Sequence, residues 1–167
     1  MKHGVECIIK KLKTEKIKMI RRFKGRTKMM SLPWTTGQVV TKGGLVAWAT
    51  GKLIPAIAGY AGDRIVGVIP YAITSASGVY TTQGDVLVEV PVDKNTVWEC
   101  DVDTTEALVA TDMGDYMDLS SESGYTNGHV DSGETTEDVF YCVGFISATK
   151  GLFILNIGPG CNTGTDV

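Results

Sequence analysis

The sequence predicts an all-β fold, and three observations support this prediction. After residue 30, apolar residues mostly alternate with polar ones at a period of two, which is the side-chain period of a strand. The apolar segments are short and rich in Val, Ile and aromatic residues. They are separated by turn-forming residues, and the 20 Gly against 5 Pro indicate many turns rather than disorder.

Nine segments have this character, and so many short strands at close spacing describe a sandwich or a barrel. In chain order they are Gln38–Val40, Gly44–Ala49, Lys52–Ala56, Arg64–Ile69, Val86–Val92, Val97–Val102, Tyr116–Leu119, Val139–Ile146 and Leu152–Ile157.

Two connections between these segments contain residues that favour turns. Thr50-Gly51 predicts a two-residue hairpin, because Gly adopts the positive φ that tight turns require. Asp93–Thr96 parts two strands in the same manner, and Asn95 can bend the chain through a local side-chain hydrogen bond.

Within "DVLVEVPV" the alternation predicts one buried face and one wet face. The first face holds Val86, Val88, Val90 and Val92, and the second holds Leu87, Glu89 and Pro91. Because proline cannot donate a ladder hydrogen bond, Pro55 and Pro91 are expected at an edge or at a strand end. The acidic stretch Ser120–Asp138 predicts an exposed loop, with a small hairpin turning at Asn127-Gly128.

The charge of the chain is divided along its length. Residues 1–30 hold eleven basic and two acidic residues, so 11 − 2 gives +9. The remaining residues hold five basic and seventeen acidic residues, so 5 − 17 gives −12. This division indicates a basic arm at residues 1–30, an acidic β body at residues 31–160 and a short tail at residues 161–167.

The arm has apolar residues mostly three and four apart between Val5 and Lys24, a pattern that predicts a basic amphipathic helix ending near Gly25. Lys16 interrupts the apolar stripe. Met29 and Met30 stand directly before the β pattern, so a start at either methionine, without an arm, is an alternative interpretation.

The remaining composition narrows the class of protein. No apolar run approaches the roughly 20 residues that span a bilayer, and no signal peptide is seen, so we expect no membrane partner and synthesis in the cytosol. The four cysteines have no metal-ligand spacing and predict reduced thiols, with Cys100 and Cys142 as small apolar strand residues.

No sequence pattern indicates a catalytic site. The two histidines are His3 and His129, and His129 beside Asp131 is more typical of a solvated loop than of a base. No nucleotide-binding or nucleophile motif occurs. A bound Ca²⁺ or a carbohydrate-active site would need the acidic residues Asp101, Asp103, Asp112 and Asp115 to converge.

Several stretches, taken in order, resemble the head-decoration, or capsid cement, proteins of tailed bacteriophages. They are "TTGQVVTKGGLVAWATGKLIPAIAGYAGDRIVGVIPYA", "GDVLVEVPVDKNTVWECDV", "ALVATDMGDYMDL" and "DVFYCVGFISATKGLFILNIG", which together cover about residues 31–158. The resemblance implies a small β-barrel or β-tulip-like body, commonly trimeric, that lies on the outer surface of the virion capsid. It implies binding to the major capsid protein, with no enzyme activity, cofactor or small-molecule substrate.

A partner surface is expected where the arm meets the body. Tethered basic residues gain affinity for an acidic capsid surface from the domain already bound there. The expected partner-binding residues are Lys10, Lys11, Lys13, Arg21, Arg22, Lys24, Arg26 and Trp34. Trp48 and Trp98 are expected in the core.

Two alternatives stay open. A tail, neck or fibre-base component would share the β-rich body, and would form rings or filaments instead of trimers. A nucleic-acid-binding protein would use the basic arm, although the arm lacks the interleaved aromatic residues that stack on single strands, which makes nucleic acid the less favoured partner.

Overall fold

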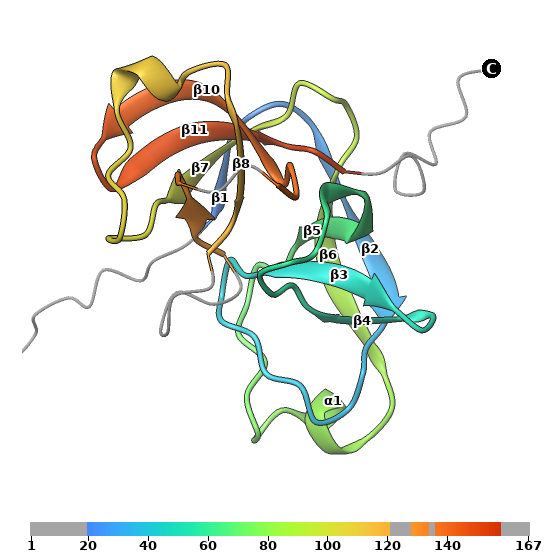
Figure 1. The fold of residues 1–167 in the computed structure, drawn as a ribbon. Helices are drawn as coiled ribbons and strands as arrows, with labels where there is room; N and C mark the ends of the chain where they lie inside the picture. The colour runs from blue at the N-terminus through green and yellow to red at the C-terminus, as the bar shows by residue number, and fades with distance from the viewer. Residues whose placement is uncertain (1–19, 121–127, 134–135, 158–167) are drawn as a thin grey trace, which may run out of the picture.

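The computed structural model describes residues 20–120, 128–133 and 136–157, which form two antiparallel β-sheets (Figure 1). The six strands of the first sheet, here called sheet A, are β1 (Arg21–Lys24), β7 (Val97–Asp101), β8 (Tyr116–Leu119), β9 (Val130–Asp131), β10 (Phe140–Ser147) and β11 (Lys150–Leu155). The five strands of the second, sheet B, are β2 (Thr27–Pro33), β3 (Leu45–Ala49), β4 (Lys52–Pro55), β5 (Ile65–Val68) and β6 (Asp85–Pro91).

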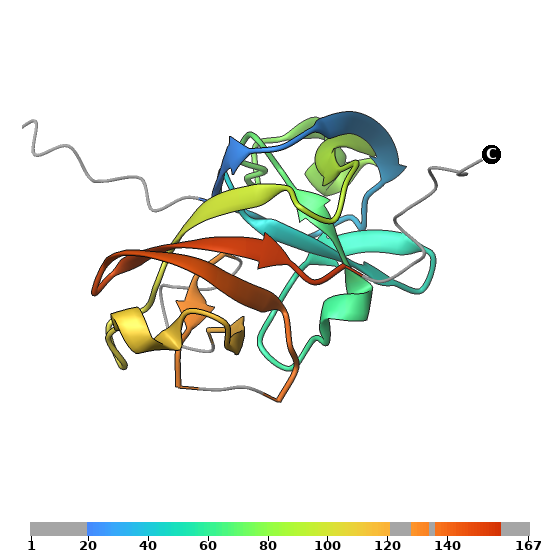
Figure 2. The ribbon, with the colours of Figure 1, turned by 90° about the horizontal axis from the view of Figure 1, so that it is seen from above.

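The strand order shows that both sheets are open. Sheet A has the order β1-β7-β11-β10-β8-β9, and sheet B has the order β2-β6-β5-β3-β4. The two sheets lie at different ends of the molecule in Figure 1, and Figure 2 shows them from above. The prediction of an all-β body of short antiparallel strands is therefore confirmed, but neither sheet closes on itself into a barrel.

Within the described residues, three short helical turns lie in the connections between strands. They are η2 (Gly62–Arg64), α1 (Gly78–Thr81) and η3 (Ala110–Asp112). In the described part of the chain, no helix is long and apolar enough to cross a membrane.

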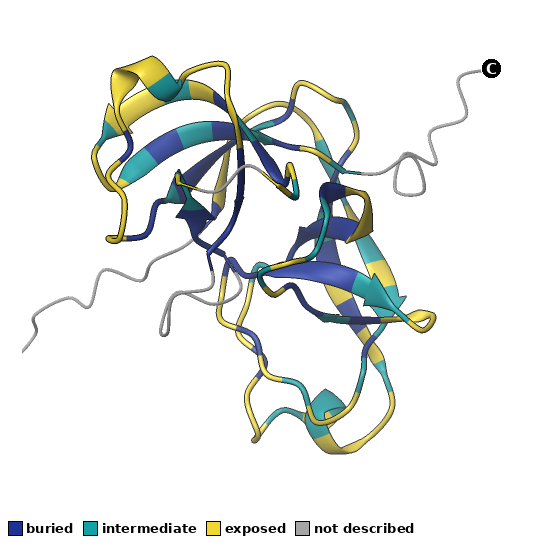
Figure 3. Ribbon diagram, in the orientation of Figure 1, coloured by how far each residue is buried: buried dark blue, intermediate teal, exposed yellow. Residues whose placement is uncertain are grey.

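The apolar interior consists of two clusters, one on each side of sheet B. Buried residues of both sheets are dark blue in Figure 3. The first joins both sheets, because Leu45 and Ile65 of sheet B pack with Trp98 and Phe153 of sheet A. The second lies under the other face of sheet B and includes Trp34, Val46, Leu53, Val86 and Val88. Successive strand residues such as Val46 and Ala47 therefore enter different clusters, as the alternation of side chains requires.

Most of the predicted strands are present with small shifts at their ends. Tyr116–Leu119 has the predicted bounds, whereas only Val40 of the segment Gln38–Val40 makes a β-bridge, to Ile73. The Thr50-Gly51 hairpin is confirmed, since both residues have positive φ, 48° and 79°, between paired Ala49 and Lys52.

Both prolines lie at strand ends, as predicted from their lack of a backbone N–H. Pro55 is the last residue of edge strand β4, and Pro91 is the last residue of β6. The alternation in β6 is confirmed for its first five residues after Asp85. It fails at the end of the strand, where Pro91 is buried and Val92 is 41% exposed.

The Asp93–Thr96 joint differs from a hairpin, because β6 and β7 belong to different sheets. The bend is held by Asp93, whose Oδ1 accepts hydrogen bonds from the Asn95 backbone N–H at 3.2 Å and from Thr96 Oγ1 at 3.0 Å. The predicted turn residue was therefore wrong: the carboxylate of Asp93 organises this turn, and the Asn95 backbone is its donor.

The largest correction concerns the N-terminal residues. The helix predicted over Val5–Lys24 is wrong for Arg21–Lys24, which form β1, and Thr27–Pro33 form β2. The body therefore includes residues 20–30, which the sequence had assigned to the arm, while residues 1–19 lie outside the described part. A strand is favoured here because both sheets have an edge for this segment to pair with, and edge strands tolerate charged side chains.

Candidate interaction surface

One continuous segment, residues 20–33, completes an edge of each sheet, and we call it the strap (Figure 2). Ile20 anchors its beginning, since this side chain is 2% exposed and packs in the first cluster. β1 then pairs with β7, and β2 pairs with β6 over seven residues.

Gly25 allows the strap to turn from one sheet to the other. Its φ is +102°, in the left-handed region that favours glycine, and a Cβ at this position would lie 2.6 Å from the Cα of Thr96. The Thr96 hydroxyl, whose single proton is shared with Asp93 Oδ1, also lies 3.0 Å from the Arg26 carbonyl oxygen. The turn is thus packed directly on the joint between the sheets.

An ion-pair cluster holds β1 to sheet A. Arg21 Nη2 lies 2.7 Å from Glu99 Oε2, and Lys150 Nζ lies 2.9 Å from Glu99 Oε1 and 3.4 Å from Asp101 Oδ1. The Glu99 side chain is only 8% exposed. The hydrogen bond from Arg21, followed by the bond and charge of Lys150, holds the pKa of Glu99 below its ordinary value despite burial. The same bonds with Glu99 raise the pKa of Arg21 and of Lys150.

Two further arginines of the strap bind acidic groups of the body. Arg22 Nε lies 3.6 Å from Glu89 Oε1, and Arg22 Nη1 donates to Thr27 Oγ1 at 2.6 Å. Arg26 Nε lies 3.7 Å from Asp93 Oδ2. The pKa of Asp93 is lowered mainly by the hydrogen bond from Thr96, with smaller contributions from Arg26 and the Asn95 backbone.

These contacts give three of the predicted partner-binding residues a role within the chain. Arg21, Arg22 and Arg26 bind acidic residues of their own chain, which sequence reasoning did not anticipate. The opposite charges of the two segments were the available signal, although they did not identify the partners. Lys24 is exposed and has no acidic partner within ion-pair distance in the described part of the chain. Lys10, Lys11 and Lys13 lie outside the described residues.

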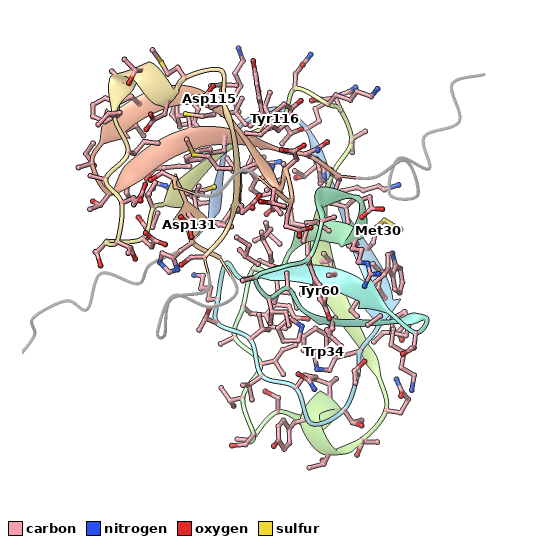
Figure 4. All side chains as sticks on the ribbon, in the orientation of Figure 1. Met30, Trp34, Tyr60, Asp115, Tyr116 and Asp131 are labelled. Carbon is pink, nitrogen blue, oxygen red and sulfur yellow. The ribbon has the colours of Figure 1, made fainter. Side chains whose placement is uncertain are left out.

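Trp34 does not lie on the surface, so its predicted role as a contact residue is wrong for the folded chain. Its side chain is 0% exposed and packs in the second cluster (Figure 4). The reason is its position directly after β2, where the chain turns under sheet B and Trp34 forms a parallel bridge with Leu53. Trp98 is buried as predicted, and Trp48 is half-buried.

Near its β2 edge, sheet B carries exposed apolar side chains on the face opposite the second cluster. Met29 pairs with Glu89 and Ser31 pairs with Leu87, so Met29 and Leu87 are diagonal neighbours on one face. They are 51% and 47% exposed. Tyr71 is 38% exposed, and its hydroxyl accepts a hydrogen bond from the Leu87 backbone N–H at 2.8 Å. We call Met29, Leu87 and Tyr71 the sheet B patch.

A second set of exposed apolar residues lies at the end of sheet A formed by β10 and the η3 turn (Figure 3). We call this set the apolar end, and it comprises Val109, Met113, Val143, Phe145 and Ile146. The acidic residues Glu106, Asp112 and Asp115 lie in the β7–β8 connection that contains η3. Figure 4 labels Asp115.

A pocket of about 320 Å³ lies where the β6–β7 joint meets the ends of β8, β10 and β11. Its lining includes Asp93, Lys94, Tyr116, Tyr141 and Asn156. The two tyrosine rings contact each other with centroids 5.0 Å apart. Asp93 and Asn156 are already bound within the chain, since the Asn156 side-chain amide donates to the Asp138 carbonyl at 2.8 Å.

The acidic residues considered for cation binding have roles in the local backbone structure. Asp103 is 1% exposed and accepts hydrogen bonds from Ser120 Oγ at 2.7 Å and from the Thr105 N–H at 3.1 Å. Asp112 accepts the N–H of Val109 at 2.7 Å. Within the described ranges, no group of three or more His, Cys, Asp or Glu side chains could hold a metal ion.

The described residues of the predicted acidic loop are less exposed than expected. His129 is 6% exposed, which corrects its interpretation as a solvated residue, because β9 pairs beside it with β8. Asp118 is 5% exposed and accepts the backbone N–H groups of Thr136, Glu137 and Asp138 at 2.8–2.9 Å. Residues 121–127, including the predicted turn residue Asn127, lie outside the described part.

Cys100 and Cys142 are free and buried within strands β7 and β10, as predicted. Burial raises the pKa of both thiols. A raised pKa lowers the thiolate fraction, so neither cysteine has the character of a nucleophile.

No protein-family model, no curated protein and no solved structure matches this chain.

Proposed function

We propose that this chain is a structural protein of a tailed-phage virion, which binds the outer surface of the capsid and stabilises the lattice of major capsid subunits. The observation that carries the proposal is the sheet B patch, in which Met29 and Leu87 are about half exposed on adjacent strands. Exposed apolar groups gathered on one sheet face are typical of protein–protein contacts. The resemblance of residues 31–158 to capsid cement proteins supplies the partner.

The edges of sheet B support attachment to a repeating shell. β2 and β4 are its two edge strands. Trp34 and Thr35 already pair with part of β4, whereas the outer side of β2 leaves backbone groups available for an added strand. Met29 belongs to β2, so the apolar patch and an open edge lie together. A capsid segment that adds to β2 would cover Met29 and gain backbone hydrogen bonds in the same step.

The nucleic-acid alternative receives less support. Three of the strap arginines already form ion pairs with Glu99, Glu89 and Asp93 of the body. A phosphate backbone would have to compete with these carboxylates, which reduces the number of cations free to release counterions.

Binding to undecorated phage heads tests the proposal. We expect saturable binding of the full chain, a higher melting temperature of the heads, and a loss of binding of at least about tenfold for the double variant M29S/L87S. I57S is the matched control, since Ile57 is 48% exposed outside the patch. No binding to heads, with binding to duplex DNA that falls steeply with salt, would instead support the nucleic-acid alternative. Rings or filaments of the purified protein that bind tails would support a tail or neck component.

A further inference from the structure

We infer that copies of this chain associate head to tail, with the β1 edge of sheet A in one copy docked on the apolar end of sheet A in the next. The inference rests on the proposed function, because a capsid decoration protein occupies neighbouring lattice positions and its copies therefore lie side by side. It deepens that function by naming the two surfaces through which neighbouring copies contact each other.

The five residues of the apolar end lie on two segments, β10 and the connection that contains η3, which are hydrogen-bonded to each other. Val143, Phe145 and Ile146 of β10 are 38%, 41% and 46% exposed, and Val109 and Met113 beside η3 are 49% and 51% exposed. Backbone hydrogen bonds tie the η3 segment to β10 at two points. Gly114 N–H donates to the Cys142 carbonyl at 2.9 Å, and Leu108 N–H donates to the Ala148 carbonyl at 3.0 Å.

The connection that carries part of the apolar end is acidic. Residues 102–115, between β7 and β8, contain Asp103, Glu106, Asp112 and Asp115 and no Lys or Arg. Glu106 and Asp115 are exposed, and Asp112 is half-buried. A partner that covers this apolar surface must therefore bring positive charge next to it.

The opposite edge of the same sheet supplies that charge. β1 is the first strand of sheet A and the apolar end belongs to its other half, beyond β7 and β11. Phe23 of β1 is 59% exposed between Arg22 and Lys24. The edge thus presents an aromatic side chain flanked by cations and a row of open backbone groups.

The net charge near β1 stays positive after the internal ion pairs are counted. The seven cations are Arg21, Arg22, Lys24, Arg26, Lys28, Lys94 and Lys150, and the four acids are Glu89, Asp93, Glu99 and Asp101, so 7 − 4 gives +3. Lys24 and Lys94 are exposed and have no acidic partner within ion-pair distance among the described residues.

Complementary surfaces on opposite edges favour a head-to-tail contact over a symmetric one. A two-fold contact through the apolar end would bring two acidic rims together, and one through β1 would bring two basic edges together. A head-to-tail contact pairs opposite charges at every interface. Such contacts close into a ring, as in a trimer, when the rotation between copies allows it.

Charge reversal of each surface in the full chain tests this arrangement. Sedimentation velocity over a concentration series should show oligomers that dissociate as salt rises from about 0.05 to 0.5 M. K24E/K94E and E106K/D115K should each weaken association at least about tenfold. A chain that carries all four substitutions has both surfaces reversed, so its association should recover.

The apolar contact has an independent test. F145S/I146S should abolish association, while V39S/I57S, which changes two similarly exposed residues elsewhere, should leave it unchanged. Far-UV circular dichroism confirms that each variant keeps its strands. A wild-type chain that stays monomeric would overturn the inference, as would stronger association of E106K/D115K, which is the mark of a symmetric contact. Heads that bind a protein without self-association would overturn this inference and leave the proposed function standing.

Discussion

Arg21 and Glu99 lie 78 residues apart in sequence, and their side chains meet at 2.7 Å across the edge of sheet A. The carboxylate is 8% exposed, whereas the guanidinium is 63% exposed. The basic N-terminal segment and the acidic body therefore fit each other within one chain, and Lys150 completes the neutralisation of Glu99 from the other side.

The first prediction concerns Glu99. Glu99→Gln should lower the free energy of unfolding by about 1–3 kcal/mol, because both cations lose a charged acceptor in a largely buried place. Urea unfolding at neutral pH measures this change. Glu106→Gln is the matched control on an exposed glutamate and should change stability by less than about 0.5 kcal/mol. Equal effects of the two substitutions would contradict the role assigned to the ion-pair cluster.

The pH dependence follows from the same group. The folded chain holds the pKa of Glu99 below its ordinary value of 4.5. Its stabilising contribution is therefore fully present above that value and is lost as the pH falls through the folded pKa. Unfolding free energies between about pH 3 and pH 7 should decline at the acid end, and E99Q should show a shallower decline. Parallel curves for the two proteins would show that other carboxylates dominate acid unfolding.

The strap itself can be removed at a methionine. A chain that starts at Met29 loses Ile20 and β1, and should be less stable by about 3–5 kcal/mol through lost apolar burial and the loss of Arg21, one of the two cations that pair with the buried Glu99. A chain that starts at Met19 keeps the whole strap and should retain the melting temperature of the full chain. A stable Met29 protein would mean that the body does not need the strap.

Gly25 and Gly51 form a matched pair for the strap turn. Both have positive φ, +102° and +79°, but only at Gly25 would a Cβ meet other atoms within 4 Å, the nearest being Thr96 Cα at 2.6 Å. Gly51→Ala should cost about 1–2 kcal/mol from the backbone conformation alone. Gly25→Ala adds a steric clash and should cost about 2–5 kcal/mol in thermal or urea unfolding.

Trp34 should behave as a core residue. Trp34→Ala should destabilise the chain by about 3–5 kcal/mol, because a fully buried side chain is removed from the second cluster. Trp34→Phe should cost less, since the buried indole N–H has no hydrogen-bond partner in the described part of the chain. If W34A kept full stability and lost only partner binding, the buried position would be contradicted.

The sequence predicted the parts of the fold that local chemistry determines. Alternation located β6, and the Thr50-Gly51 turn was identified from the φ that glycine allows. The strap was missed because its pairing is non-local. Arg21–Lys24 has no apolar alternation, and its strand conformation depends on β7, far away in sequence. Trp34 was misplaced for the same reason, since its burial depends on Leu53 of edge strand β4.

The candidate surfaces were even less accessible to sequence reasoning. Exposed apolar residues such as Met29 and Phe145 resemble core residues in a one-dimensional pattern. Only the register of β2 with β6 and the bulges of β10 show which of them face outward.

The path of residues 20–33 along both sheets also constrains the order in which the molecule can form. These residues leave the ribosome early, yet the strand that pairs with β1 and the lysine that shares Glu99 are synthesised much later. Closing such distant contacts is slow compared with forming hairpins such as β3–β4. The earliest-made strands therefore cannot pair until residues 85–101 have been synthesised, and the ion-pair cluster around Glu99 is complete only after Lys150 has followed.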